Sequence, residues 1–396
     1  MAALANPKIR AMVAGQQAAI EEVKQFRAGF SGEVIWFHCA SLGEFEQGRP
    51  LMEALLQRKP DAKLAVSFYS PSGYEKRKGY DKAALLFYLP ADTPANAEAL
   101  IATLKPTSIF WIKYELWPNY LLTIKQNQIP AYLVSASLRP AHVQGIRGAF
   151  TKALLECFKI IFLQFEPGLK NLHKLGLQNG VVVGDTRFDN ILALTAAKPD
   201  MPWLDDFMEG RKLVVLGSVW KEDMQRLWFW LNTFHERERD CILLAPHEMN
   251  EQWPKILEEH LPGFSLAYFS KVKHSIPANL DILVMDEVGN LSRIYSRAWV
   301  AWVGGGFKTG LHNILEPAGW GVPTAFGPKT HKFPEAAMLE KAKGAWHVTN
   351  EKTAAAIFEG LIRIKKDRDV AGLNARKFLE QNSGATTRIL QHLGIA

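Results

Sequence analysis

The strongest constraint on the fold is the regular alternation of short apolar runs with amphipathic segments along most of the chain. Short apolar runs are typical of buried strands, and the segments between them carry the spacing of surface helices. Strands that alternate with helices form a mostly parallel sheet covered by helices on both faces. The first series of predicted strands comprises Val34–Cys39, Lys63–Phe68, Thr107–Ile112, Ala131–Val134, Ile160–Leu163 and Val181–Val183.

A second series of the same kind predicts a second domain, which suits a chain of 396 residues. Its strands are Lys212–Leu216, Ile242–Ala245, Ile282–Met285, Ala298–Val303 and Pro323–Phe326. Between the two series Pro199 and Pro202 interrupt any regular element. We therefore expect one doubly wound α/β domain over residues 1–190, a linker over 191–210 and a second domain over 211–375. Residues 376–396 should form a C-terminal helix that packs back on the first domain.

Charge and cysteine content limit the class of partner and the compartment. Lys and Arg number 47 against 40 Asp and Glu, so the net charge of +7 favours an anionic partner: nucleic acid, a phosphorylated sugar or an acidic membrane surface. Cys39, Cys157 and Cys241 are odd in number and lie in apolar runs, which indicates buried thiols in a reducing compartment. No apolar stretch reaches the roughly 18 to 20 residues of a spanning helix. The basic N-terminal segment is either the remnant of an interfacial helix or a plain surface helix.

The glycine-rich stretch from Val300 to Pro328 is the clearest candidate for a phosphate site. An apolar strand ends in Gly304, Gly305 and Gly306, and a helical pattern starts at His312 and continues through Asn313, Ile314, Leu315 and Glu316. Glycines allow close approach of a ligand, and the first amides of a helix are unpaired donors. Glu316 could accept hydrogen bonds from a ribose, so a nucleotide fits better than free phosphate.

The alternative is that the glycines form only a tight turn from strand to helix. Thr309 stands where GxGxxG requires its last glycine, and GxxxxGK[ST] is absent, which disfavours a dinucleotide fold and a P-loop.

The loop after the first strand carries the candidate catalytic residue. In WFHCASLGEFEQGRP, Ser41 and Gly43 precede Glu44 at a helix start, where a general base could take a proton from an acceptor hydroxyl. The alternative is a glutamate that only complements the helix dipole. A helix N-terminus lowers a carboxylate's pKa, so burial or a neighbouring carboxylate such as Glu46 or Glu115 would have to offset it.

Further loops at strand ends complete the candidate set. Glu115 in KYELWPN could position an acceptor or tune the pKa of Glu44, or could merely cap a helix. Arg139 and Arg147 form either a cationic rim for a phosphorylated or membrane-bound acceptor or a solvated basic surface. In the second domain Ser218, then Pro246 and His247, then Val288, Gly289 and Asn290 follow predicted strands. No acidic pair is placed for a metal, and Asp367–Asp369 lies in a charged helix. Amides, helix dipoles and cations would then stabilise a leaving phosphate.

Together these segments resemble the 3-deoxy-D-manno-octulosonic acid (Kdo) transferases of lipopolysaccharide assembly, from Trp36 to about Gly344. The resemblance rests on WFHCASLGEFEQGRP, ELWPN, GDTRFDN, GS, DEVGNL and GGGFKTGLHNILEPAGWGVPTAFGP. It implies a GT-B fold with two Rossmann-like domains facing a central cleft, and an inverting transfer of Kdo from CMP-Kdo to a lipid A precursor (lipid IVA) without metal or other cofactor. Glu44 would be the base. Pro246, His247, Val288–Asn290 and Asn313–Glu316 would bind CMP.

The resemblance also implies partners and a location: CMP-Kdo, a lipid A precursor and the cytoplasmic face of an anionic inner membrane, with no nucleic acid. Attachment would be peripheral or through a single N-terminal anchor missing from this sequence. Pro246-His247 stands where many members have Pro-Arg-His, and Lys113 replaces one of two glutamates before Leu-Trp-Pro. Two alternatives stay open: another GT-B enzyme on a UDP-sugar, such as an epimerase, and a non-catalytic nucleotide- or lipid-binding module.

Overall fold

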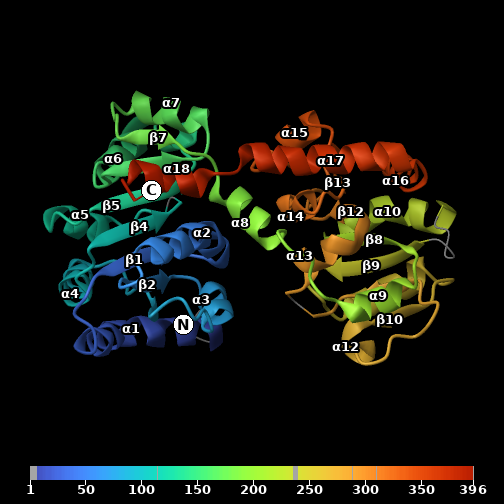
Figure 1. The fold of residues 1–396 in the computed structure, drawn as a ribbon, viewed down its shortest axis with the longest axis horizontal. Helices are drawn as coiled ribbons and strands as arrows, with labels where there is room; N and C mark the ends of the chain where they lie inside the picture. Colours follow the sequence, from blue (N-terminus) through green and yellow to red (C-terminus); the bar gives the residue numbers. More distant parts are fainter. Residues whose placement is uncertain (1–6, 114, 235–239, 288, 309, 396) are drawn as a thin grey trace. The chain divides into compact units, whose positions relative to one another are not determined.

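The computed structural model describes residues 7–113, 115–234, 240–287, 289–308 and 310–395. The chain divides into two compact units (Figure 1). The first comprises Met1–Asn190 with Asn382–Ala396, and the second comprises Ile191–Gln381. Each unit is built on its own seven-stranded sheet, in which all paired strands are parallel.

The sheet of the first unit has the strand order β3-β2-β1-β4-β5-β6-β7. Its strands are β1 (Val34–Cys39), β2 (Lys63–Phe68), β3 (Leu85–Tyr88), β4 (Ser108–Ile112), β5 (Ala131–Ala136), β6 (Ile160–Leu163) and β7 (Gly180–Val182). The helices are α1 (Pro7–Ala28), α2 (Leu42–Arg58), α3 (Pro71–Arg77), α4 (Pro94–Leu104), α5 (Pro118–Gln126), α6 (Gly145–Leu155), α7 (Glu166–Lys174), α8 (Thr186–Leu194) and the C-terminal α18 (Ala385–His392), with a 3₁₀ turn η2 (Pro140–His142).

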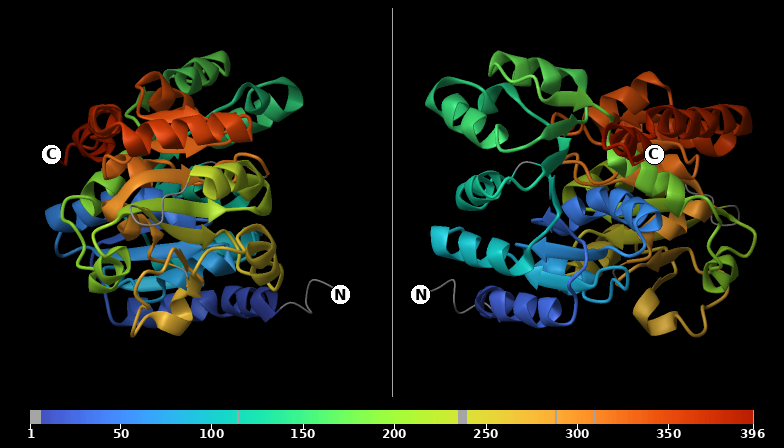
Figure 2. Two further views of the ribbon diagram at one scale, coloured as in Figure 1. Left: turned by 90° about the vertical axis from the view of Figure 1, so that its right-hand side faces the viewer. Right: turned by 60° about the vertical axis from the view of Figure 1, so that its left-hand side comes forward.

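Both faces of this sheet are buried, as the runs of apolar residues predict. Successive side chains of β1 point to opposite faces: Val34 and Trp36 join the core formed with α1, α4, α5, α6 and α7, whereas Ile35 and Phe37 join the core formed with α2 and α18. α1 packs against α4 and β3 (Figure 2), and its Ala19 and Val23 are fully buried. In the described part of the chain, no helix is long and apolar enough to span a bilayer.

The second unit repeats the architecture with the strand order β10-β11-β9-β8-β12-β13-β14. Its strands are β8 (Lys212–Val219), β9 (Asp240–Pro246), β10 (Leu266–Tyr268), β11 (Ile282–Val284), β12 (Ala298–Val303), β13 (Thr324–Phe326) and β14 (Ala345–His347). Its helices are α9 (Pro202–Met208), α10 (Lys221–Phe234), α11 (Gln252–His260), α12 (Phe269–Val272), α13 (Leu291–Ile294), α14 (Leu315–Gly319), α15 (Pro334–Lys341), α16 (Glu351–Arg363) and α17 (Lys365–Asn382), with η3 (Tyr295–Arg297).

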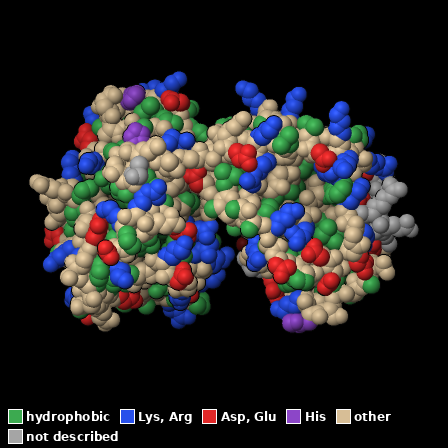
Figure 3. All heavy atoms as spheres, in the orientation of Figure 1, with side chains coloured by type: hydrophobic (Ala, Val, Ile, Leu, Met, Phe, Trp, Pro, Cys, Tyr) green, Lys and Arg blue, Asp and Glu red, His purple; other side chains and the backbone are tan. Residues whose placement is uncertain are grey.

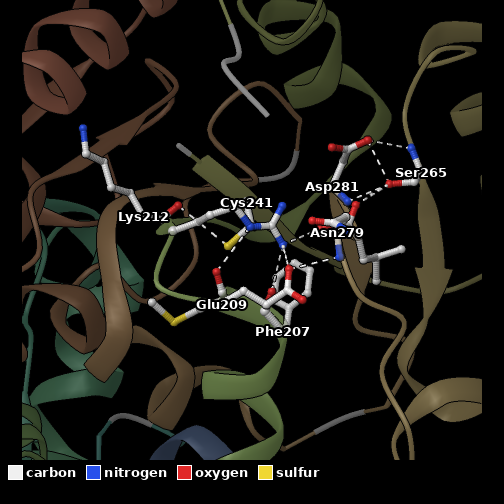
Figure 4. A network of polar contacts seen from close by, with 10 residues as sticks. Phe207, Glu209, Lys212, Cys241, Ser265, Asn279 and Asp281 are labelled. Carbon is white, nitrogen blue, oxygen red and sulfur yellow. Dashed lines mark hydrogen bonds and ion pairs between the residues drawn. The ribbon is translucent and has the colours of Figure 1, made fainter. Parts of the chain in front are cut away.

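A polar network supports the segments that lead into β8, β10 and β11 (Figure 4). The Arg211 guanidinium donates to the carbonyl oxygens of Phe207 and Leu280, each at 2.9 Å. Asp281 accepts hydrogen bonds from the Ser265 amide and hydroxyl at 2.7 and 2.9 Å. These contacts satisfy backbone groups at the amino ends of the strands.

The segment predicted as a linker belongs to the second unit. Met201, Leu204 and Phe207 are buried in a core that also contains Leu213 and Val215 of β8. The prediction fails because Pro202 occupies the first turn of α9, where its missing amide hydrogen is harmless, rather than ending a helix. The sequence analysis also did not predict three short strands, β3, β10 and β14.

α18 returns to the first unit. Ile389 and Leu390 are buried in the same core as Phe37 and Phe110. The Asp189 carboxylate accepts hydrogen bonds from the amides of Gly384 and Thr386, at the start of α18, at 2.5 and 2.6 Å. The chain therefore leaves the first unit once and closes it again with its last helix.

The three cysteines are free and buried, in line with reduced thiols. Lys and Arg side chains are spread over the visible faces of both units and are interspersed with Asp and Glu (Figure 3). The positive net charge is therefore distributed over the surface shown and does not form one continuous basic face there.

We expect Ile389→Ala to destabilise the protein by about 2–5 kcal/mol, because it removes a fully buried side chain from the core of the first unit. Urea unfolding followed by circular dichroism measures the change. Gln391→Ala, on the exposed side of the same helix, is the control and should change stability by less than about 0.5 kcal/mol. Equal stability of the two variants would contradict the assignment of α18 to this core.

Candidate active site

In each sheet, the strand order reverses between two neighbouring strands, and the candidate residues cluster there. In the first sheet this point lies between β1 and β4, and in the second between β8 and β12. Loops that leave adjacent parallel strands in opposite directions open a crevice at the carboxyl ends, where open α/β sheets bind ligands. The Glu44 and Glu115 loops follow β1 and β4, and Ser218 and the glycine loop lie at the ends of β8 and β12.

Glu44 lies at the third position of α2 and forms a capping box with Ser41. The Ser41 amide donates to the Glu44 carboxylate at 3.1 Å, and the Glu44 amide donates to the Ser41 hydroxyl at 3.4 Å. The side chain is folded back on the helix start and is only 7% exposed. A carboxylate in this position is held in one orientation.

Burial, and after it the charge of Glu115, raise the pKa of Glu44 from its ordinary value to about 7. Lys113 and the hydrogen bonds from the backbone of Ala40 and Ser41 act in the opposite direction. The sequence analysis noted that a helix start disfavours a base, and the structure shows that desolvation outweighs the helix. A carboxyl group that titrates near neutrality can exchange a proton with a hydroxyl at working pH.

Gly43 precedes Glu44 and is exposed, and a Cβ added there would meet no atom within 4 Å. Protein packing therefore does not require glycine at this position.

The loop that carries Glu115 is anchored on both sides. The Trp111 indole donates to the carbonyl oxygen of Glu115 at 2.7 Å, and the Lys113 amide donates to the Val134 carbonyl at 2.8 Å. Lys113 adopts a left-handed backbone conformation with φ of 66°. The sequence analysis noted Lys113 only as a departure from a motif, but its charge acts on Glu44 against that of Glu115.

A second buried carboxylate at the same edge was not among the predicted site residues. Asp185 follows β7 and is 1% exposed. Burial alone would raise its pKa, but the paired Arg187 guanidinium, at 2.6 Å, together with Lys113 keeps the pKa below its usual value. Gln47 of α2 contacts Asp185 at 3.5 Å. The motif GDTRFDN contained this pair, but an Asp-x-Arg spacing alone gives no sign of burial.

Arg139 and Arg147 are exposed, on the segment after β5 and on α6 respectively. They belong to the first unit, as predicted for the acceptor side, but no described contact joins either of them to Glu44. Their role stays a prediction.

Two amides of the glycine loop bond within the protein, and the predicted contact of this loop with a phosphate stays a prediction. The Gly304 amide donates to the Gly217 carbonyl at 2.9 Å, and the Gly305 amide donates to the buried Asp223 carboxylate at 2.8 Å. A Cβ on Gly304 would lie 2.2 Å from the Ser218 carbonyl oxygen, and one on Gly306 would lie 2.6 Å from Gly327. The glycines allow backbones to pack closely, and two of their amides are already occupied in this conformation.

The expected helix from His312 begins later and is short. α14 comprises Leu315–Gly319, with Ile314 at the N-cap position. Asn313 precedes it: its Oδ1 accepts from the Leu315 amide at 3.2 Å, and its Nδ2 donates to Glu316 at 3.0 Å. Ile314 and Leu315 are buried core residues, so only their backbone could meet a ligand. The hydrogen bond from Asn313 fixes the orientation of the Glu316 carboxylate.

Three rings gather at the carboxyl ends of β8, β9 and β12. Trp220 and His247 have ring centroids 4.5 Å apart, His247 stacks on His312 at 4.3 Å, and the Trp220 indole donates to His312 Nε2 at 3.2 Å. Burial, with a contribution from His247, lowers the pKa of His312 to about 4, and burial also lowers that of His247. Both imidazoles are therefore neutral near pH 7.

The positive charge of this cluster comes from Lys308. Its ammonium lies 4.1 Å from the centre of the Trp220 ring and 3.5 Å from the Glu222 carboxylate. The sequence analysis missed both Trp220 and Lys308, because a tryptophan or lysine near a loop carries no pattern of its own.

The remaining predicted donor residues also lie at this edge. Ser218 has a left-handed conformation with φ of 52°, Gly289 is exposed with φ of 118°, and Asn290 occupies the N-cap position of α13. Pro246 ends β9 next to His247. Val288 lies outside the described residues. Within the described ranges, no group of three or more His, Cys, Asp or Glu side chains could hold a metal ion.

Comparison with known proteins identifies relatives over most of the chain. Residues 14–190 match the family model of 3-deoxy-D-manno-octulosonic-acid transferase (kdotransferase). The 3-deoxy-D-manno-octulosonic acid transferase of Haemophilus influenzae is 27% identical, over 93% of this chain and 90% of that protein. The enzyme of the same name from Rickettsia felis is 25% identical, over 92% of this chain and 79% of that protein.

A solved structure with a similar fold is UDP-GlcNAc 2-epimerase from Neisseria meningitidis bound to UDP-GlcNAc, with a TM-score of 0.67 and 14% identity. The match covers 92% of this chain and 100% of that one. At this identity the likeness shows the fold alone, which is the GT-B type with two parallel-sheet α/β domains.

The buried Glu44 carboxyl should destabilise the protein when it ionises. Its pKa of about 7 in the folded state exceeds the ordinary value of 4.5, so its contribution to stability is lost as the pH rises through 7. We expect Glu44→Gln to be more stable than wild type at about pH 8, by at most about 3 kcal/mol, and equally stable at about pH 4. Urea unfolding at both pH values measures this. A glutamine variant that is less stable at the higher pH would contradict the desolvated state of the carboxyl.

Proposed function

We propose that this chain, which belongs to the 3-deoxy-D-manno-octulosonic acid (Kdo) transferase family and is a glycosyltransferase of lipopolysaccharide synthesis, transfers Kdo from CMP-Kdo to the lipid A precursor lipid IVA. The transfer inverts the anomeric carbon and needs no metal. The observation that carries this proposal is the buried Glu44 carboxyl at the start of α2, whose pKa is raised to about 7. A base of this strength, at the switch point of a sheet, suits the activation of a hydroxyl.

The first unit supplies the base. The Glu44 carboxylate accepts the proton of a sugar hydroxyl as that oxygen forms a bond to the anomeric carbon of Kdo. The bond between this carbon and the CMP phosphate oxygen breaks at the same time, and the phosphate takes the electron pair. A single displacement of this kind inverts the configuration.

The second unit supplies the donor site. His247 is exposed on a stack of neutral rings, which offers a flat surface for the cytosine base. Asn313 holds Glu316 in an orientation from which it can accept hydrogen bonds from the ribose hydroxyls. Because the Gly304 and Gly305 amides are occupied, we assign the departing phosphate to the Ser218 hydroxyl and the Lys308 ammonium instead. This cation provides the charge stabilisation that a metal would otherwise supply.

An attachment to the cytoplasmic face of the inner membrane fits the surface of α6. Ile146 is 94% exposed and Phe150 is 57% exposed, four residues apart and hence on the same side of the helix. Arg147 and Lys152 lie on the same helix, and Leu122 on the contacting α5 is 46% exposed. Apolar side chains flanked by basic ones suit the headgroup region of an anionic bilayer. We propose that this α6 surface (Leu122, Ile146, Arg147, Phe150, Lys152) brings the protein to its lipid acceptor.

Glu44→Ala should reduce Kdo transfer by about 100- to 10,000-fold, because general base catalysis contributes a factor of this size. Transfer is measured by mass spectrometry of the lipid product after incubation with CMP-Kdo and lipid IVA. The variant should still be stabilised by CMP in a thermal melt, as wild type is, whereas UDP and GDP should stabilise neither.

Three outcomes would contradict this proposal. Full activity of Glu44→Ala would remove Glu44 as the base. Stronger stabilisation by UDP than by CMP would favour an enzyme of UDP-sugars, and CMP binding without transfer by wild type under any condition would favour a binding module.

The double variant Ile146→Asp/Phe150→Asp should bind vesicles of phosphatidylglycerol and phosphatidylethanolamine at least about tenfold more weakly than wild type, since two apolar anchors are lost. Co-sedimentation with the vesicles measures this. Leu373→Asp on α17, which changes a similarly exposed apolar residue in the second unit, should bind as wild type does. Equal binding by all three proteins would exclude the α6 surface.

A further inference from the structure

His38 is the one histidine in the described residues of the first unit that is completely buried, at 0% exposure, and the mechanism above does not use it. It lies on β1, one residue before Cys39 at the end of the strand. Burial lowers the pKa of its imidazole to about 3, so the ring is neutral at working pH. A buried neutral imidazole needs a partner for each nitrogen.

The partners of His38 fix its tautomer. The Trp117 indole N–H lies 3.2 Å from His38 Nε2, and an indole can only donate, so Nε2 accepts. The proton of the neutral ring is then on Nδ1, which donates to the Ser67 hydroxyl oxygen at 2.9 Å. The Trp36 indole donates to the same oxygen, also at 2.9 Å. A chain of hydrogen bonds therefore connects the interior of the sheet to Trp117.

Trp117 and Glu115 belong to the same loop, and the loop is held on both sides by this aromatic cluster. The His38 ring packs against Trp111 with centroids 4.3 Å apart, and the Trp111 indole holds the Glu115 carbonyl oxygen at 2.7 Å. His38 holds Trp117, and the Tyr69 ring packs against Trp117 at 4.8 Å. The Glu115 side chain is exposed, so the backbone anchors rather than packing of its carboxylate determine where it lies.

We propose that His38 is a positioning residue: by accepting the Trp117 hydrogen bond, it fixes the loop that carries Glu115 and keeps that carboxylate beside Glu44. The inference rests on the proposed role of Glu44 as the base. It assigns to the buried imidazole no contact with substrate and no proton transfer.

The consequence is a specific effect on the pH profile. The charges of Glu115 and Lys113, both from this loop, act on the pKa of Glu44. Glu44 and Glu46 of α2 in turn raise the pKa of the Cys39 thiol at the end of β1. Desolvation and Glu115 raise the pKa of Glu44, and Lys113 lowers it. Lys113 keeps its own anchor to Val134. Loosening of the Trp117 side of the loop therefore weakens the raising effect of Glu115, and the acid limb of the activity profile moves to lower pH.

The experiment compares kcat/KM against pH for three substitutions at His38. His38→Leu removes the acceptor for Trp117. His38→Gln can place its amide oxygen where Nε2 was, and His38→Asn can replace only the Nδ1 side. We expect the leucine and asparagine variants to shift the acid limb downwards, in the direction that Glu115→Gln shifts it, and to lower kcat by up to about 100-fold with little change in KM. The glutamine variant should stay near wild type.

Trp117→Phe removes the same hydrogen bond from the other partner and covers the case in which His38→Leu does not fold. It should reproduce the shift of the acid limb, and the double variant His38→Leu/Trp117→Phe should be no worse than either single one. An unchanged acid limb and kcat in Trp117→Phe and in the folded His38 variants, with reduced melting temperature alone, would overturn the proposal.

Failure of the inference is distinguishable from failure of the proposed function. If Glu44→Gln keeps full transfer activity, Glu44 is not the base, whatever the His38 variants do. If Glu44→Gln is inactive while His38→Leu keeps the wild-type profile, the base stands and only the positioning role of His38 is wrong.

Discussion

One carboxylate withdrawn from water at the start of a helix is the interaction on which the candidate chemistry depends. The charge of Lys113 and the backbone hydrogen bonds from Ala40 and Ser41, just before α2, favour the ionised form of Glu44, whereas burial and Glu115 oppose it. If the helix alone acted, the carboxylate would be a weak base, and if burial alone acted, it would stay protonated. The opposition of the two effects brings the group to the range in which it can take a proton from a hydroxyl and later release it.

The loops at the carboxyl ends of the two sheets are held in place by different contacts. In the first unit, buried tryptophans and a neutral histidine hold the loop after β4 through side-chain hydrogen bonds. In the second unit, backbones pack against each other at Gly304 and Gly306, and the buried Asp223 carboxylate accepts from the amides of Gly305 and Trp220. Burial raises the pKa of Asp223 to about 6, which is the cost of using a carboxylate inside the unit as a loop anchor.

Because the Gly304 and Gly305 amides bond within the second unit, the anion recognition that we propose there relies on side chains. His247 and His312 are neutral, so they contribute surface and hydrogen bonds rather than charge. Lys308 is the cation next to this cluster, and its pairing with Glu222 means that a phosphate must compete with a carboxylate for it. The affinity of the proposed donor site for a phosphate should therefore depend on the charge of both residues.

The sequence by itself determined the two parallel α/β units, most strand positions and the loops in which candidate residues lie, because the period of apolar residues and the end of each strand are local properties. The strand order of each sheet, the return of α18, the membership of residues 191–210 in the second unit and the burial of Glu44 were decided only by tertiary structure. The use of the Gly304 and Gly305 amides was also decided by tertiary structure. A glycine pattern shows that another group can approach the backbone closely, but not whether that group is a ligand or another loop. His38 illustrates the same limit, since a histidine on an apolar strand gains a role only when Trp117, far away in sequence, is folded against it.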